Sequence, residues 1–202
     1  MFPSEGNVGH RRQQDHYGRK AKSDGYAARS VYKLEEIQKR FQVIPKNGAV
    51  LDLGCSPGSW SNYVKRVGGA DTTMVGIDLT EVSGYLGRQF VDSVFDVPEE
   101  DLREALGGGA DLVISDMAPA TSGNRFTDHV RQIELAEQAR VLAARLLRPG
   151  GNFVVKVFEG EDASDLVARI RADYGKTKRV KPKAVRKESV EFFVVGLGRR
   201  DD

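Results

Sequence analysis

The sequence contains a single cysteine, Cys55, and three histidines among its 202 residues. One cysteine excludes an internal disulfide and cannot by itself build a cysteine-rich metal site. His10, His16 and His129 are not spaced as in a metal-binding motif, so we assign no metal to this protein. The scarcity of cysteine favours a reducing interior, and we expect a cytoplasmic protein.

Long hydrophobic runs are missing as well. No apolar segment approaches the roughly 20 residues that a helix needs to span a bilayer. The N-terminal stretch MFPSEGNVGHRRQQDH lacks the apolar core of a signal peptide. The content of 40% hydrophobic and 30% charged residues is that of an ordinary globular protein, and no repeat or linker divides the chain. We therefore expect a monomer without a membrane-bound part.

The small net charge of +2 hides an uneven distribution of charge. Residues 10–40 hold nine Lys/Arg against four Asp/Glu, residues 175–191 hold seven against two, and residues 95–117 hold seven acids and one arginine. Either basic segment alone could be solvated surface, but a pair of them predicts that both ends of the chain grip a polyanion. With Tyr17 and Tyr26 interleaved, such cations suit RNA phosphates and unpaired bases. The expected RNA-binding residues are Arg11, Arg12, Arg19, Lys20, Lys22, Arg29, Lys181, Lys183 and Arg186.

Apolar segments alternate with amphipathic ones along most of the chain. The predicted strands are GAVLDLG (48–54), TTMVGID (72–78), FVDSVF (90–95), GGGADLVISD (107–116), NFVVKVF (152–158) and a closing hairpin of 177–184 and 190–198. Helical spacing predicts helices at 30–41, 57–67, 135–146 and 166–174. Alternation of this kind indicates a mostly parallel sheet covered by helices on both faces.

These elements predict an α/β fold of the Rossmann-like kind. Its sheet has seven strands, of which the closing hairpin contributes one antiparallel strand. We expect one domain at residues 30–202, preceded by a basic, partly disordered extension at residues 1–29.

The stretch LDLGCSPGSW (51–60) turns from a predicted strand into glycines and a proline. Open parallel sheets bind ligands beyond the carboxyl ends of their strands, near the point where strand order reverses. The stretch lacks the G-x-G-x-x-G spacing of dinucleotide-binding folds, which argues against an NAD-dependent oxidoreductase. It offers instead a slim loop beside the carboxylate of Asp52.

Two further acids follow predicted strands. Asp78 ends the second strand, where a ribose diol is usually held, and Asp96 follows the third, where it could accept a hydrogen bond from an adenine amino group. Taken singly, such residues could be turn, cap or surface residues, and Trp60 could be core filling. Together they fit S-adenosylmethionine, whose sulfonium and amino groups tolerate surrounding acids. We assign its site to Asp52, Gly54, Pro57, Gly58, Trp60, Asp78 and Asp96.

Four charged residues far apart in the sequence are predicted to meet at this same edge of the sheet. Asp116 follows the fourth strand, Lys156 lies inside the end of the fifth, and Glu191 begins the last one. A lysine within an apolar strand is costly unless it is paired or functional. Because the last strand is antiparallel, its start lies beside the ends of the parallel strands. Lys33, at the start of the first predicted helix, completes the set. A buried ion pair without catalytic function is the alternative.

The motifs ARSVYKL, LDLGCSPGSWS, SDMAP, VVKVFEGE and SVEFFVVGLGRR stand in the order found in the FtsJ family of ribose 2′-O-methyltransferases, which this chain resembles over roughly residues 14–200. The resemblance matches Lys33, Asp116, Lys156 and Glu191 to the family's catalytic K-D-K-E tetrad. It also implies that Asp116 belongs to the cofactor site, close to the methionine end of S-adenosylmethionine. Ala120 stands where the family usually has asparagine.

The resemblance implies methylation of a ribose 2′-hydroxyl in RNA with S-adenosylmethionine. It points to a uridine of large-subunit ribosomal RNA, met in the assembling subunit. A tRNA or mRNA-cap ribose methyltransferase and a non-catalytic RNA-binding assembly factor are the alternatives. A ribose hydroxyl is a poor nucleophile until it loses its proton, so Lys156 is expected either to remove that proton or to orient a lone pair. Lys33 is expected to hold the hydroxyl or the developing alkoxide.

Overall fold

A single twisted sheet forms the centre of the computed structural model, which describes the backbone of residues 8–201 and the side chains of residues 16–201. The strands are β1 (Ala49–Leu53), β2 (Thr73–Asp78), β3 (Arg88–Val91), β4 (Ala110–Ser115), β5 (Leu147–Phe158), β6 (Tyr174–Val180) and β7 (Glu191–Arg199). Their order across the sheet is β3-β2-β1-β4-β5-β7-β6. Only β7 runs against its neighbours, pairing antiparallel with both β5 and β6, while the pairs β1–β2, β1–β4, β2–β3 and β4–β5 are parallel. The predicted seven-stranded α/β fold is confirmed.

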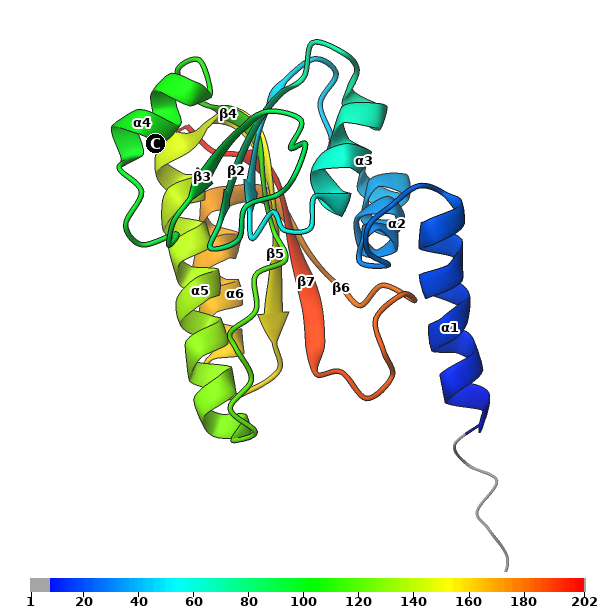
Figure 1. Ribbon diagram of the computed structural model, residues 1–202. Helices are drawn as coiled ribbons and strands as arrows, with labels where there is room; N and C mark the ends of the chain where they lie inside the picture. The colour runs from blue at the N-terminus through cyan, green and yellow to red at the C-terminus, as the bar shows by residue number, and fades with distance from the viewer. Residues whose placement is uncertain (1–7, 202) are drawn as a thin grey trace, which may run out of the picture.

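Helices cover both faces of this sheet (Figure 1). They are α1 (Val8–Ser23), α2 (Val31–Phe41), α3 (Ser59–Gly68), α4 (Glu99–Ala105), α5 (Arg125–Leu146) and α6 (Ala163–Asp173). One apolar cluster fills the layer under α4, α5 and α6, with members such as Leu102, Leu142 and Ile170. The other fills the layer under α1, α2 and α3, with members such as Ala21, Ile37 and Trp60. The first cluster is continuous along α5 because Ala136, Ala139 and Ala143 lie on one helical face.

Strand alternation decides which layer each side chain enters. On β5, Phe153, Val155 and Val157 belong to the layer of α5, whereas Val154 belongs to the layer of α2. Lys156 has the parity of Val154 and therefore points to the α2 side. Glu191 shares the parity of Phe193, which also belongs to the α2 layer and pairs with Lys156. The pleat thus directs both charged side chains toward the helix that carries Lys33.

The segment before Ser30 packs on the rest of the chain. Ala21 and Tyr26 are buried in the cluster under α2 and α3. The backbone N–H of Ala28 donates a hydrogen bond to Ser59 Oγ at 2.7 Å. The indole N–H of Trp60 donates to the carbonyl oxygen of Ser30 at 2.9 Å. Residues 21–30 therefore form the outer wall of the α2–α3 layer. Within the extension of residues 1–29 that was expected to be partly disordered, residues 8–23 form α1, and residues 1–7 lie outside the described ones.

Several local elements differ from those expected. Helix α1 was not predicted because its sequence, VGHRRQQDHYGRKAKS, has few apolar residues. Helix α4 buries only Leu102 and so gives no helical apolar period. Strand β3 ends at Val91, four residues before the expected end. Tyr174 begins β6 instead of ending α6, because its buried ring packs on Phe153 with ring centroids 6.0 Å apart.

None of the helices in the described part of the chain combines the length and apolarity that crossing a membrane requires.

Candidate active site

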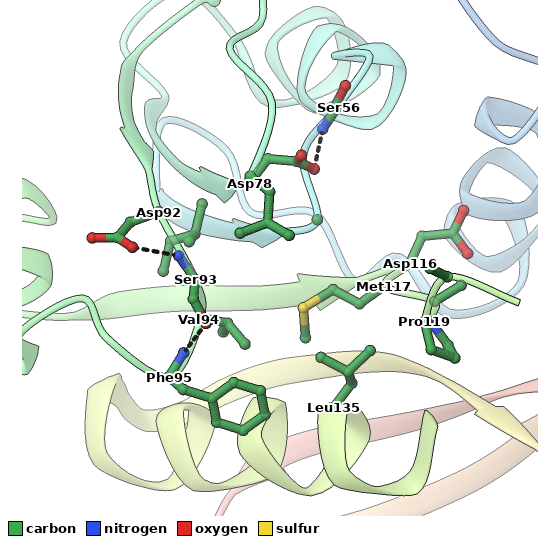
Figure 2. Close-up of a pocket in the computed structure, with 15 residues that line it drawn as sticks. Ser56, Asp78, Asp92, Ser93, Val94, Phe95, Asp116, Met117, Pro119 and Leu135 are labelled. Atoms are coloured by element: carbon green, nitrogen blue, oxygen red, sulfur yellow. Dashed lines mark hydrogen bonds between the residues drawn. The ribbon is translucent and has the colours of Figure 1, made fainter. Parts of the chain in front are cut away.

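A cavity of about 510 Å³ opens at the point where strand order reverses, between the carboxyl ends of β1 and β4 (Figure 2). This volume lies in the usual range of small-molecule sites, ~300–1,000 Å³. Its lining residues are Gly54, Ser56, Ile77, Asp78, Leu79, Asp92, Ser93, Val94, Phe95, Asp116, Met117, Ala118, Pro119, Ala120 and Leu135. Three of them are carboxylates and none is basic, so the cavity suits a ligand that carries positive charge.

Gly54 lets the chain turn sharply at the end of β1. Its φ of +78° lies in the left-handed region that favours glycine. A Cβ at this position would lie 2.7 Å from Met117 Cγ and 3.2 Å from Met117 Cα. The missing side chain therefore leaves room where the loop after β1 meets the loop after β4, and this room is part of the cavity.

Asp78, at the end of β2, fixes the loop that follows β1. One carboxylate oxygen accepts a hydrogen bond from the backbone N–H of Ser56 at 2.9 Å, and the other accepts from the N–H of Thr80 at 2.9 Å. In Figure 2 Asp78 and Leu135 lie on opposite sides of the cavity, with Met117 between them. Asp78 is thus held rigidly at one wall, while the apolar side chains of Met117 and Leu135 form the other.

Two lysines and two carboxylates meet beside this cavity. Lys156 Nζ lies 3.2 Å from Asp116 Oδ1 and donates a hydrogen bond to the carbonyl oxygen of Asp116 at 2.5 Å. Lys33 Nζ lies 3.4 Å from the same Asp116 Oδ1 and 2.7 Å from Glu191 Oε1. Asp116 therefore belongs both to the lining of the cavity and to the charged cluster.

The cluster is nearly closed to solvent. The Lys156 residue is 5% exposed, and the Lys33 side chain is 13% exposed. Burial alone would lower the pKa of Lys33, but the charges of Asp116 and Glu191 outweigh it and raise that pKa. Lys33 is consequently a fixed cation at neutral pH, able to stabilise negative charge that develops on a neighbouring oxygen.

Asp52 lies behind the loop and not in the cavity. It is 1% exposed, and the Ser61 hydroxyl lies 2.5 Å from its Oδ2 and 3.0 Å from the hydroxyl of Tyr85. Burial raises the pKa of Asp52 to about 7, although the hydrogen bond from Ser61 opposes this and the charges of Asp116 and Asp78 reinforce it. The carboxyl group is thus a buried support for the loop that precedes α3.

The raised pKa predicts how Asp52 affects stability with pH. The unfolded chain loses this proton near the reference value of about 3.9, whereas the folded protein holds it up to about 7, so stability falls as pH rises through that window. The Asp52→Asn variant keeps an oxygen for Ser61 and has no proton to lose. Urea unfolding at pH 5, 6 and 7 is expected to show that the free energy of unfolding of the variant, relative to that of the wild type, increases with pH. The slope should approach about 1.4 kcal/mol per pH unit. Parallel stability profiles for the two proteins would refute this account.

The residues expected at the cofactor site divide into three groups. Gly54, Asp78 and Asp116 line the cavity. Asp52 in β1 and Pro57 and Gly58 in the loop after it do not line the cavity. Gly58 is the N-cap of α3, with a φ of +92°. Trp60 and Asp96 lie elsewhere. Trp60 is 4% exposed in the core under α2, with its ring centroid 5.9 Å from that of Phe193. Because the Trp60 ring is buried in the core, it is not available to stack on a ligand.

Asp92, and not Asp96, is the acid that lines the cavity after β3. The early end of β3 puts Asp92, Ser93 and Val94 directly at the carboxyl edge, where they line the cavity. Asp96 is exposed further along the loop, its backbone N–H bonded to the Ser93 carbonyl at 3.0 Å. The sequence expectation extended this strand through FVDSVF, four residues beyond the end of β3. Leu79, Met117 and Leu135 were missed because apolar lining residues carry no distinct sequence signal.

The expected RNA-binding residues lie on α1, in the segment before α2, and in the loop between β6 and β7. Arg29, Lys181, Lys183 and Arg186 line a surface pocket next to Tyr17. Lys20 and Lys22 lie in the last turn of α1, where Lys20 Nζ is 4.3 Å from the ring centroid of Tyr32, and Arg19 is exposed on the same helix. The structure does not describe the side chains of Arg11 and Arg12. Tyr26, expected to face RNA, is instead buried, with Arg66 over its ring at 5.0 Å.

Within the residues that the structure describes, no three His, Cys, Asp or Glu side chains gather in a way that could hold a metal ion.

Comparison with known proteins gives a consistent picture. Residues 26–199 match the FtsJ-like methyltransferase family. Proteins named "Ribosomal RNA large subunit methyltransferase E" are similar over nearly the whole chain. The one from Desulfosudis oleivorans is 46% identical over 194 residues, covering 95% of this chain and 93% of its own. The one from Bdellovibrio bacteriovorus is 42% identical over 191 residues, covering 93% and 97%. A crystal structure of a ribosomal RNA methyltransferase from Plasmodium falciparum has the same fold, with a TM-score of 0.78 at 23% identity over 88% of this chain and 100% of that one.

Proposed function

This chain belongs to the FtsJ-like methyltransferase family, and from that premise we propose that it transfers the methyl group of S-adenosylmethionine to a ribose 2′-hydroxyl of large-subunit ribosomal RNA. The relatives' names supply the class of RNA. The observation that carries the proposal is the double position of Asp116, which lines the acidic cavity and lies within 3.4 Å of both lysines. Such an arrangement brings a cofactor and a nucleophile to one point.

The residues of the cavity fit S-adenosylmethionine. When bound, this cofactor supplies an electrophilic methyl group on a positively charged sulfur. Asp78 offers carboxylate oxygens at the end of β2, where ribose hydroxyls are held in related sheets. Phe95 and Leu79 are 49% and 76% exposed at the cavity and offer apolar surface to an adenine ring. Asp116 places a negative charge at the end of the cavity that faces the tetrad.

The tetrad would act on the RNA hydroxyl. Lys33, held as a cation between Asp116 and Glu191, would stabilise the alkoxide that develops as the hydroxyl attacks. Lys156, tied by the carbonyl and carboxylate of Asp116, would contact the same hydroxyl and either take its proton or orient its lone pair. Holding the hydroxyl in line with the methyl group is itself worth several orders of magnitude in rate.

The test is transfer of a labelled methyl group. The protein is incubated with labelled S-adenosylmethionine and large ribosomal subunits from cells that lack this methyltransferase. We expect label at a single ribose, revealed by a phosphodiester that resists alkaline hydrolysis, because alkaline cleavage needs a free 2′-hydroxyl. Naked tRNA and capped mRNA serve as competing substrates.

Three outcomes would contradict the proposal. Label on a base would refute the site of methylation, and stronger labelling of tRNA or of the mRNA cap would transfer the function to the alternative substrates. Binding to the subunit without any labelling, by protein that binds S-adenosylmethionine, would favour a non-catalytic assembly factor.

A further inference from the structure

The geometry points to a second RNA subsite: a pocket between Tyr17 and the loop that joins β6 to β7 (residues 181–190) binds an unpaired nucleobase next to the methylated nucleotide, and Arg29 and Arg186 hold the phosphate between the two. This inference rests on the proposed function and names the form of RNA that the tetrad receives.

The pocket has the composition that a nucleobase requires. It encloses about 340 Å³ and shares no lining residue with the cofactor cavity. Its floor is apolar, formed by the buried residues Pro182, Ala184 and Val185. Five cations and one carboxylate complete the lining, and these residues are Arg29, Lys181, Lys183, Arg186, Lys187 and Glu188. An apolar floor with a mainly cationic lining matches a flat base with a phosphate on either side.

Tyr17 supplies an aromatic face at this pocket. Its ring is only partly buried and lies 5.5 Å from the ring of Tyr32, centroid to centroid. Tyr17 also borders a neighbouring cavity of about 520 Å³ that contains Lys20, Tyr32 and Lys183. The Tyr17 ring thus lies between two cavities and packs on Tyr32. It can stack on a base without a change in the core.

The loop opposite Tyr17 is fixed in place by hydrogen bonds. The backbone N–H of Lys183 donates to Glu36 Oε2 at 2.7 Å, which ties the loop to α2. Lys181 Nζ donates to the Ser189 carbonyl at 2.7 Å, and the N–H of Val185 donates to the Pro182 carbonyl at 3.0 Å. A pocket whose walls are already fixed loses little conformational entropy when a ligand binds.

The pocket opens directly toward the tetrad. Arg29 and Arg186 line it and also line a cavity of about 530 Å³ that includes Lys33 and Glu191. Among the described side chains, no carboxylate lies within ion-pairing distance of either guanidinium. Burial and the charge of Arg186 lower the pKa of Arg29, against the opposing charge of Glu191. These two guanidiniums interact through their charges, share their cavity with the carboxylates of Glu188 and Glu191, and can both donate hydrogen bonds to a phosphodiester.

These contacts imply a single-stranded or unstacked substrate. A base can enter a pocket lined on one side by Tyr17 only after it leaves its neighbours in a duplex. An acidic peptide would satisfy the cations but would not use the aromatic face, so the base is the occupant that accounts for the whole lining.

Photocrosslinking tests the position of the base. The full-length protein is irradiated with a single-stranded octaribonucleotide that contains 5-iodouridine, and the adducts are located by mass spectrometry. We expect the principal adduct on Tyr17, removed by an excess of unsubstituted RNA and not by polyglutamate of equal charge. Adducts confined to residues outside this pocket, or equal competition by polyglutamate, would overturn the inference.

Affinity measurements test the aromatic contribution with matched variants. Tyr17→Phe is expected to bind the octaribonucleotide within twofold of the wild type, whereas Tyr17→Leu, which keeps apolar bulk, is expected to bind about tenfold more weakly. Arg169→Ala serves as a control for charge, because Arg169 pairs with Glu137 on the α5–α6 side; this variant is expected to bind like the wild type. Equal affinity of the Leu and Phe variants would overturn the inference.

Further measurements check that the variant is folded and distinguish a failure of this inference from a failure of the proposed function. S-adenosylmethionine binding and thermal unfolding check that Tyr17→Leu is folded. If it is not, abasic residues are placed in turn beside the nucleotide that the wild type methylates, and one position must raise KM about tenfold. If the wild type methylates ribosomal RNA and no abasic position matters, only the subsite is refuted. If no methylation occurs, the proposed function itself fails.

Discussion

Replacement of Lys156 by alanine is expected to lower methyl transfer by at least about 10³-fold, the scale of a lost proton-transfer or orienting group. The Lys156 side chain is one of two ammonium groups at Asp116, and it is the more deeply buried of the two residues. Water that enters the vacated space cannot reproduce a donor fixed by the Asp116 carbonyl at 2.5 Å. The measurement is single-turnover transfer of labelled methyl to large ribosomal subunits.

Binding of S-adenosylmethionine to the Lys156→Ala variant should stay within a few-fold of the wild type, because Lys156 does not line the cofactor cavity. Lys156→Met provides a second inactive variant that keeps most of the side-chain volume. The exposed Lys46, between α2 and β1, provides a control, since Lys46→Ala removes a lysine that belongs neither to the tetrad nor to the two basic segments and should retain full turnover. Turnover near the wild-type value in both Lys156 variants would remove this residue from the mechanism.

An arginine at this position separates the two roles open to Lys156. Arginine keeps the charge and its donors but cannot give up a proton at neutral pH. Residual transfer by Lys156→Arg well above that of Lys156→Ala would identify an orienting cation. Equal inactivity of both variants, with cofactor binding intact, would favour proton removal.

A methyl group added at Gly54 is expected to reduce affinity for S-adenosylmethionine by at least about tenfold, which corresponds to about 1.4 kcal/mol. The new Cβ would lie 2.7 Å from Met117 Cγ and 3.2 Å from Met117 Cα. The side chain of Met117 can move, but its backbone can do so only by shifting the loop that carries Asp116. The cavity would therefore close where the loops after β1 and β4 meet. Isothermal titration of the Gly54→Ala variant with the cofactor measures the loss.

The backbone strain at Gly54 needs its own control. Any residue other than glycine at a φ of +78° costs about 1–2 kcal/mol of stability, wherever it lies. Gly150 has a φ of +81° and nothing within 4 Å of a Cβ position, so Gly150→Ala has the same strain without the contact with Met117. We expect both variants to be destabilised and only Gly54→Ala to lose cofactor affinity. A similar loss of affinity in both would show that strain, and not closure of the cavity, is responsible.

The acids at the strand ends show how far local sequence carries the prediction of the site. Asp78 and Asp116 follow apolar segments with clear ends, so their place at the carboxyl edge could be predicted from the sequence. The end of β3 could not be located in FVDSVF, because the exposed Val91 and Phe95 and the buried Val94 give no alternation that marks a boundary. This four-residue error moved the expected acid from Asp92 to Asp96.

Trp60 and Tyr26 show what composition cannot decide. Both are aromatic residues next to polar or basic segments, where stacking on a ligand or on RNA was a reasonable expectation. Both are buried in the layer under α2 and α3. Tyr17 has the same kind of neighbours in the sequence yet keeps part of its ring exposed. Whether a ring faces the core or a partner depends on how the helices that carry it are rotated, which a local pattern does not specify.

The sequence by itself determined the order of the strands and of the helices α2, α3, α5 and α6, the one antiparallel strand, and the four charged residues near one edge of the sheet. These follow from apolar periodicity and chain direction, which act between residues close in sequence. Only the tertiary structure decided that Lys33 and Asp116, 83 positions apart, lie at 3.4 Å, and that Asp116 also lines the cofactor cavity. Such distances depend on which face of the sheet α2 covers and at what angle it packs, and those are set by close packing of side chains from the whole chain.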